Sequence, residues 1–149
     1  IQDVDGVTFD PATVIARAAT QYRISPKVIL ATLQKECSGV TRTTRPSDPT
    51  LRFLMGCVEP TTARQQLACA ADRFGAYRDQ LNRTGSTTTG WQVGVAKVTV
   101  DGVTATPATK AVAGQFTYTP YAGVQWGGNR GGVGGVFLFY DAWRQFGVG

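Results

Sequence analysis

The chemistry open to this chain is limited to carboxylates, hydroxyls, amides and cysteines, because the sequence contains no histidine. The lack of imidazole excludes Ser-His-Asp and Cys-His catalysis as well as histidine-ligated zinc. Three cysteines are also too few for a four-cysteine zinc site. Of the ten carboxylate side chains only two are glutamates, Glu36 and Glu59. We therefore expect an acid–base centre built on carboxylates, with no metal and no cofactor.

Glu36 is the carboxylate with the most informative position. Ile29, Leu33 and Glu36 have the spacing i, i+4, i+7 on a predicted helix over 26–38, so they share one stripe. An apolar stripe faces the core, so we expect Glu36 to be partly desolvated just before Gly39 ends the helix. Such an acid can keep a proton and give it to a leaving-group oxygen, as glycosidases require. The alternative is an ordinary surface glutamate, solvated or paired with Lys35 or Arg42.

A second carboxylate would distinguish hydrolysis from single-acid chemistry. Retaining glycosidases place it about 5–5.5 Å from the acid and inverting ones about 6.5–9.5 Å away. Asp48 follows Glu36 by twelve residues, but it sits between Pro46 and Pro49 in a sequence typical of a turn, where Asp usually accepts from backbone amides. Glu59 precedes the longest predicted helix, where the helix dipole already accounts for it. The residues thus favour a single acid, with Asp48 as the possible second carboxylate.

The charge and composition of the chain limit the classes of partner that we expect it to bind. Fifteen Lys and Arg against ten Asp and Glu give a net charge of +5, which favours an anionic partner such as an acidic cell-wall polysaccharide. The cations are scattered rather than clustered, so we expect no nucleic-acid binding. The sequence has no apolar run near the ~20 residues of a membrane span, so we expect no membrane insertion.

The positioning elements are expected to be mainly helical. Four dipeptides consist of a helix-capping residue followed by proline, a pattern typical of the start of a helix. They are Asp10-Pro11, Ser25-Pro26, Glu59-Pro60 and Thr106-Pro107. The longest helix is expected over about 62–81, with Thr62 and Gln65 as a capping box. A short aromatic helix over 137–146, closed by Gly147, is expected at the end.

One region differs from this helical pattern. Valines on both sides of Asp101-Gly102 predict a hairpin with a type I′ turn. Seven glycines within 123–135 predict no regular structure. The fold class is therefore α+β, mainly helical with a small β-hairpin insertion, in a single domain over 1–149.

The cysteines favour a secreted protein. Cys37, Cys57 and Cys69 allow three pairings with one thiol left over, and the sequence does not choose among them. The chain begins at Ile1 without methionine or a signal peptide, so we expect it to be a monomeric piece of a longer protein, located outside the cell or in its envelope.

Two motifs give a family resemblance. The run Ile24–Gly39, written ISPKVILATLQKECSG, resembles the signature helix of lysozyme-like peptidoglycan lytic transglycosylases, and Leu54-Met55-Gly56 resembles their Gly-Leu-Met segment. The segment 117–121, Thr-Tyr-Thr-Pro-Tyr, with Gly128-Asn129-Arg130, resembles the end of a bacterial cell-surface group with the same helix. The resemblance covers about residues 9–147 and implies a lysozyme-like fold.

The resemblance also implies roles. Glu36 would protonate the glycosidic oxygen between N-acetylmuramic acid and N-acetylglucosamine, then take the proton from the muramoyl 6-hydroxyl, giving a 1,6-anhydro product from peptidoglycan glycan strands. The other residues that it matches, or that lie beside those matches, are expected to bind substrate. They are Ser38, Met55, Gly56, Tyr118, Tyr121, Trp126 and Asn129. Tyr121 and Trp126 fall in irregular chain, where aromatic side chains more often bind ligands.

Two departures from the family pattern keep other functions open. Cys37 stands where the family has a serine directly after the glutamate, and Gly56-Cys57 stands where a glutamine usually follows Leu-Met. The alternatives are a hydrolytic muramidase, with Asp48 positioning water, and an inactive lysozyme-like module that binds the wall or has a structural role.

Overall fold

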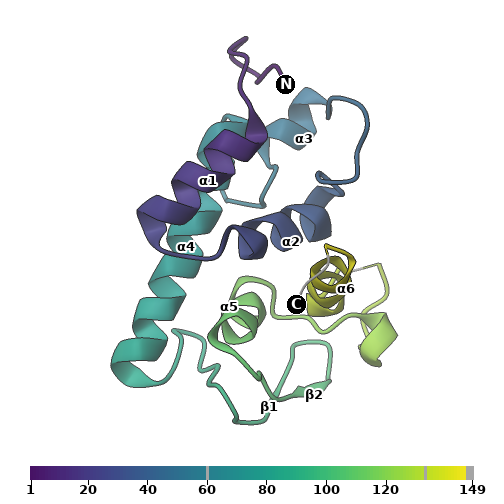
Figure 1. Cartoon of the computed structure of the whole chain (residues 1–149). Helices are drawn as coiled ribbons and strands as arrows, with labels where there is room; N and C mark the ends of the chain where they lie inside the picture. The colour runs from purple at the N-terminus through teal and green to yellow at the C-terminus, as the bar shows by residue number, and fades with distance from the viewer. Residues whose placement is uncertain (60, 133, 147–149) are drawn as a thin grey trace. The chain divides into compact units, whose positions relative to one another are not determined.

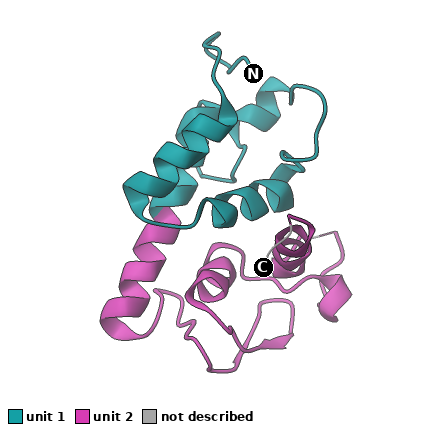
Figure 2. Ribbon diagram, viewed as in Figure 1, with its two compact units in different colours: residues 1–72 teal, residues 73–149 magenta. Residues whose placement is uncertain are grey.

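The computed structural model describes residues 1–59, 61–132 and 134–146, and it divides into two compact units (Figure 2). Unit 1 covers Ile1–Asp72 and unit 2 covers Arg73–Gly149. The described chain is mainly helical with one small antiparallel hairpin, as expected (Figure 1). Its elements are α1 (Pro11–Tyr22), α2 (Pro26–Cys37), α3 (Asp48–Arg52), α4 (Ala63–Thr84), β1 (Lys97–Val98), β2 (Thr104–Ala105), α5 (Lys110–Tyr118), η1 (Val124–Trp126) and α6 (Val136–Gln145).

The first two helices of unit 1 begin where the sequence predicts. The Asp10 carboxylate accepts hydrogen bonds from the amides of Ala12 and Thr13 at the start of α1. The Ser25 hydroxyl accepts one from Lys27 at the start of α2. Each cap satisfies amides that lack a partner within the helix, and the proline that follows lacks that amide altogether.

The end of α2 differs from the prediction. Ser38, not Gly39, takes the left-handed conformation, with φ of +54°, and its amide bonds the Gln34 carbonyl at 2.9 Å. Gly39 is needed there for a different reason. A Cβ on it would lie 2.8 Å from Cδ1 of Leu33, so the glycine permits close packing rather than the turn itself.

The start of α4 is held by a residue sixty positions away. Asp3 is 2% exposed, and its carboxylate accepts from the amides of Ala63 at 2.8 Å and Arg64 at 3.2 Å. Thr62 and Gln65 form the predicted capping box, since each backbone amide donates to the other's side chain. Pro60, which was expected to precede this helix, lies outside the described residues.

The hairpin of unit 2 is present, but its turn is not the predicted one. Lys97 pairs with Ala105 and Val98 with Thr104, and the Thr99 amide bonds the Val103 carbonyl at 2.8 Å. The loop therefore has three residues, 100–102, of which only Gly102 has positive φ, at +85°. A type I′ turn needs positive φ at two residues, whereas a three-residue loop needs it only at the last, where glycine fits.

Two further elements of unit 2 differ from those predicted. Thr109, not Thr106, caps α5 by accepting from the Val112 amide at 3.3 Å, so Pro107 lies before the helix. The glycine-rich stretch includes one short 3-10 helix, η1, contrary to the expectation of no regular structure. The final helix begins at Val136, and Gly147, expected to close it, lies outside the described residues.

The core of unit 2 surrounds an aromatic stack. The rings of Trp91 and Phe116 lie 4.4 Å apart at 20°, and both side chains are buried. Leu81, Val112, Ala113 and Val136 complete the cluster. No helix among the described residues has the length and apolar character needed to cross a membrane.

Candidate active site at the end of helix α2

Glu36 lies in the last turn of α2, one residue before the helix ends. Ile29 and Leu33, which precede it on the same stripe, are 0% and 6% exposed, whereas the Glu36 side chain is 25% exposed. The stripe predicted from the spacing thus exists, and it ends at a carboxylate still in contact with solvent. Glu36 as a whole residue is exposed, so its carboxylate is accessible to a substrate.

A cation accompanies this carboxylate. The ammonium of Lys35 pairs with Oε1 of Glu36, and the Lys35 side chain is only 4% exposed. Glu36 is therefore paired with Lys35, one of the two partners considered from the sequence. Arg42 instead donates to the Cys37 carbonyl at 3.2 Å. Glu36 is therefore an exposed glutamate in an ion pair, rather than one solvated by water alone.

The other carboxylate oxygen faces backbone. A Cβ placed on Gly56 would lie 3.5 Å from Oε2 of Glu36 and 3.9 Å from its Cδ. Gly56 has φ of +71° and is exposed, and its amide donates to the Phe53 carbonyl at 2.9 Å. Glycine is therefore favoured here by the left-handed backbone, whereas a Cβ would make only an ordinary van der Waals contact with the carboxylate.

Gln66 fixes the segment that carries Gly56. This α4 side chain is fully buried, and its Oε1 accepts from the amides of Met55 at 3.2 Å and Cys57 at 3.1 Å. Its Nε2 donates to the Glu59 carbonyl at 2.9 Å. One amide side chain thus satisfies backbone groups on both sides of Gly56, which holds that backbone against the carboxylate.

A disulfide joins the same segment to α4. Cys57 and Cys69 are bonded, which settles the pairing that the sequence left open. Cys37 is the free cysteine. Burial raises the pKa of the Cys37 thiol, so it stays protonated at neutral pH and is a poor nucleophile.

The remaining predicted residues of unit 1 have different surroundings. Ser38 is exposed at the C-terminal end of α2, two residues beyond the acid. Met55 is fully buried, so its side chain packs in the protein and cannot present a surface to substrate, which corrects the expected role. Asp48 lies in the first turn of α3, where Ser47 supplies the cap, and its Oδ1 pairs with Nη2 of Arg45 at 2.6 Å.

The predicted residues of unit 2 divide into two pairs. Tyr118 stacks on Phe74 with ring centroids 4.9 Å apart and has Arg73 over its ring, so it is packed within the unit. Tyr121 is half-buried, and its carbonyl accepts from the Val136 amide at 2.8 Å. By contrast, Trp126 is 37% exposed and Asn129 is also exposed. These two have surface that a ligand can reach.

Two exposed apolar side chains close to Gly56 in the sequence were not predicted. Phe53 is 49% exposed and Val58 is 76% exposed, and they bracket the segment with Gly56 at its centre. Sequence reasoning also missed Gln66, whose type in a helix carries no signal of burial. Among the described residues, no group of three or more potential Cys, Asp or Glu ligands could hold a metal ion.

No model of a known protein family matches the chain, and searches among curated proteins and solved structures return no significant match. The resemblance to lytic transglycosylases therefore depends on the sequence motifs alone.

Proposed function

We propose that this protein is a lysozyme-like lytic transglycosylase that cleaves the β-1,4 bond between N-acetylmuramic acid and N-acetylglucosamine in peptidoglycan, with Glu36 as its acid and base. The observation that carries the proposal is the setting of the Glu36 carboxylate. It ends a buried stripe, keeps a quarter of its side-chain surface exposed, and faces the exposed backbone of Gly56.

The reaction needs one group that gives and then accepts a proton. Protonated Glu36 donates to the glycosidic oxygen as the bond from that oxygen to C1 of the muramoyl sugar breaks. The resulting carboxylate then takes the proton of the muramoyl 6-hydroxyl while that oxygen bonds to C1. The products are a free 4-hydroxyl and a 1,6-anhydro sugar. Atoms and charge balance without water, so a second carboxylate is not required.

Lys35 supports one half of this cycle. Its ammonium pairs with Oε1 of Glu36, so a cation lies beside the carboxylate that accepts the proton in the second step. The first step needs the protonated form. Substrate that covers the exposed side of Glu36 and excludes water favours that form, because a neutral acid is easier to bury than a charge.

Other features support an anionic wall outside the cell as the substrate. The net charge of +5 favours association with an acidic polymer. The disulfide fits an oxidising compartment. Phe53 and Val58, which flank Gly56 in the sequence, are exposed apolar side chains of the kind that suits the apolar faces of sugar rings.

The test is digestion of purified peptidoglycan by the wild-type protein, Glu36→Gln and Glu59→Gln, with products read by mass spectrometry. Glu59 is the matched control, since it is the only other glutamate and is exposed. We expect anhydro-muropeptides from the wild type and Glu59→Gln. Glu36→Gln should lose at least about a hundredfold of the rate, the usual contribution of a general acid.

Each other result replaces the proposal with an alternative. Products with reducing ends, heavier by one water, would show a muramidase and direct attention to Asp48. Wall binding without released products would show a non-enzymatic wall-binding module. Full activity of Glu36→Gln would remove Glu36 from the chemistry.

A further inference from the structure

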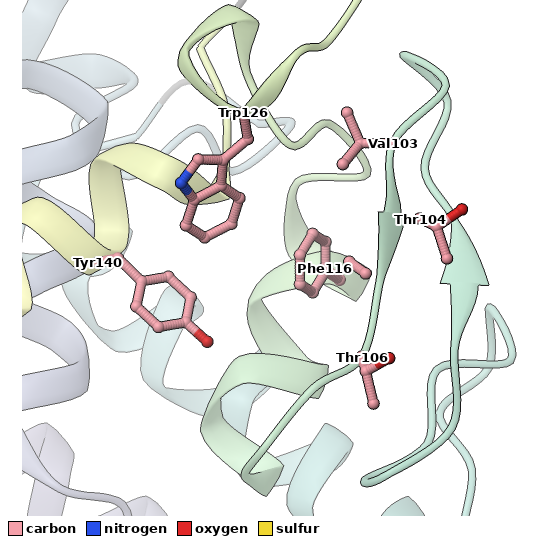
Figure 3. A pocket seen from close by; sticks show the side chains of 7 residues that line it. Val103, Thr104, Thr106, Phe116, Trp126 and Tyr140 are labelled. Carbon is pink, nitrogen blue, oxygen red and sulfur yellow. The ribbon is translucent and has the colours of Figure 1, made fainter.

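Three aromatic rings line a pocket of about 370 Å³ in unit 2. They belong to Phe116 on α5, Trp126 on η1 and Tyr140 on α6. Figure 3 shows Trp126 and Tyr140 on one side of this space, the hairpin on the other side, and Phe116 between them. All of these elements belong to unit 2, so the pocket is formed within one unit.

The hairpin side of the pocket is also apolar. Val103 and Ala105 are two residues apart and half-buried, so they share one face of the extended chain. Thr104 and Thr106 alternate with them and are exposed, and their hydroxyls point away from the aromatic rings (Figure 3). The hairpin therefore offers a ligand in the pocket apolar side chains rather than hydroxyls.

The aromatic walls are preformed. Phe116 stacks on Trp91, with ring centroids 4.4 Å apart at 20°. The rings of Trp126 and Tyr140 meet edge to face at 5.0 Å, and Phe137 contacts the Trp126 ring at 6.2 Å. Trp126 nevertheless remains 37% exposed, so a ligand can reach it. Because neighbouring rings already hold these side chains, a ligand would bind them at little cost in side-chain entropy.

The Tyr140 hydroxyl is the polar group that the pocket offers to a ligand. Figure 3 shows it directed from α6 into the space beside Phe116. Within residues 1–59, 61–132 and 134–146, this hydroxyl makes no hydrogen bond to another residue. Burial raises the pKa of Tyr140, so the hydroxyl stays protonated at neutral pH and can donate to an acceptor on a ligand.

The size and lining of the pocket define the class of ligand. An apolar cavity of about 150 Å³ binds one benzene ring, so about 370 Å³ accommodates two fused rings. None of the lining residues carries a charge, so a charged ligand would lose its hydration without gaining an ionic partner. Aromatic walls favour a planar aromatic ring over an aliphatic one of the same size, because ring faces and edges attract each other.

We propose that this pocket binds a small, uncharged, planar molecule of two fused aromatic rings, with an oxygen that accepts a hydrogen bond from the Tyr140 hydroxyl. The pocket contains no residue of unit 1 and so does not depend on the reaction proposed for Glu36.

Binding of 2-naphthol tests the proposal. Protein labelled with ¹⁵N would be titrated with 2-naphthol, with naphthalene, which lacks the oxygen, and with decahydro-2-naphthol, which has the same carbon skeleton without aromatic rings. We expect 2-naphthol to give saturable shifts of the amides of Val103, Ala105 and Phe116 and of the Trp126 indole N–H. Decahydro-2-naphthol should bind about fivefold or more weakly, since it loses the ring–ring attraction.

Variants assign the contacts. Tyr140→Phe should weaken binding of 2-naphthol about fivefold and leave that of naphthalene unchanged, because only the hydrogen bond is lost. Trp126→Ala should weaken both about tenfold, and Ala105→Leu should fill the pocket and block both. Val124→Ala is the matched control for Trp126→Ala and should change neither, because Val124 also lies on η1, is 47% exposed and does not line the pocket.

Tyr140→Phe and Ala105→Leu are conservative, so they keep the test decisive if Trp126→Ala does not fold. Unshifted pocket signals with 2-naphthol, equally tight binding of decahydro-2-naphthol, or 2-naphthol binding that survives Ala105→Leu would each overturn the inference. Shifts with tri-N-acetylchitotriose but not with 2-naphthol would also overturn it and would show a sugar subsite. Binding of 2-naphthol here by a protein that releases no muropeptides would leave the inference standing and refute only the proposed function.

Discussion

The Gly56 backbone lies against the Glu36 carboxylate, so that a Cβ on Gly56 would stand 3.5 Å from Oε2. Twenty residues of sequence separate the two, and the contact exists because Gln66 and the Cys57–Cys69 disulfide hold the segment around Gly56 to α4. The Glu36 carboxylate is therefore positioned by α2 on one side and by the Gly56 backbone, which Gln66 and the disulfide hold in place, on the other.

Gly56→Ala should lower both stability and cleavage. An L-residue in the left-handed region costs about 1–2 kcal/mol, and the added methyl group occupies space beside Oε2. Gly6→Ala is the matched control, since Gly6 has φ of +82° and an added Cβ would have no neighbour within 4 Å. Both variants should lose similar stability in urea unfolding, but only Gly56→Ala should release muropeptides more slowly. Equal cleavage by the two would show that the Glu36–Gly56 contact has no role in the reaction.

Gln66→Leu should destabilise the segment around Gly56 more than the rest of the protein. The substitution leaves the buried amides of Met55 and Cys57 without an acceptor, at about 1–3 kcal/mol for each unsatisfied group. Native-state hydrogen exchange should show faster exchange at these two amides than at those of α1. Gln65→Ala, which removes one side of the capping box, should cost only about 1 kcal/mol and leave the two amides protected.

Removing the disulfide should cost stability without removing a catalytic group. Its cysteines are 12 residues apart, and closure of a loop of about that length contributes roughly 3 kcal/mol. The double variant Cys57→Ser, Cys69→Ser should unfold at correspondingly lower denaturant concentration. Cys37→Ser should retain muropeptide release, because its thiol is protonated and takes no part in the reaction. Loss of activity in a folded Cys37→Ser protein would contradict this assignment.

Acid should destabilise the protein partly through Asp101. Burial raises the pKa of Asp101, but hydrogen bonds from the Thr99 hydroxyl and the amides of Ala122 and Gly123 outweigh it and leave the pKa lowered. A folded-state pKa below the unfolded value of 3.8 means that this stability is fully present above about pH 5 and is lost as the pH falls through the folded value.

Asp101→Asn tests this dependence. At neutral pH it should cost about 1–3 kcal/mol, since the NH₂ group that replaces one carboxylate oxygen cannot accept from the Gly123 amide. Its free energy of unfolding should also fall less steeply than that of the wild type below pH 4. Asp141→Asn removes an exposed ion pair with Arg144 and should cost less than about 1 kcal/mol. Parallel pH curves for wild type and Asp101→Asn would refute the role of Asp101.

Local signals predicted the helices best. Asp10-Pro11 and Ser25-Pro26 begin α1 and α2 because capping and the proline restriction act within three or four residues. The same device failed at Thr106-Pro107, where Thr109 offers an equally good cap three residues later. The type I′ turn failed because Asp101 is held by contacts with Ala122 and Gly123, far along the chain, rather than by the turn.

The sequence by itself determined that Glu36 ends an apolar stripe on a helix, because helical periodicity fixes which residues share a face. It also limited the chemistry to carboxylates, since histidine is absent. Only the tertiary structure decided that Gly56 meets the carboxylate, that Met55 is buried, and that Cys57 pairs with Cys69. Each of these depends on where separate segments pack in space. The side-chain pattern within one segment does not encode how far that segment lies from another. The buried side-chain amide of Gln66 fixes one such distance, because it bonds the backbone of Met55 and Cys57 to α4.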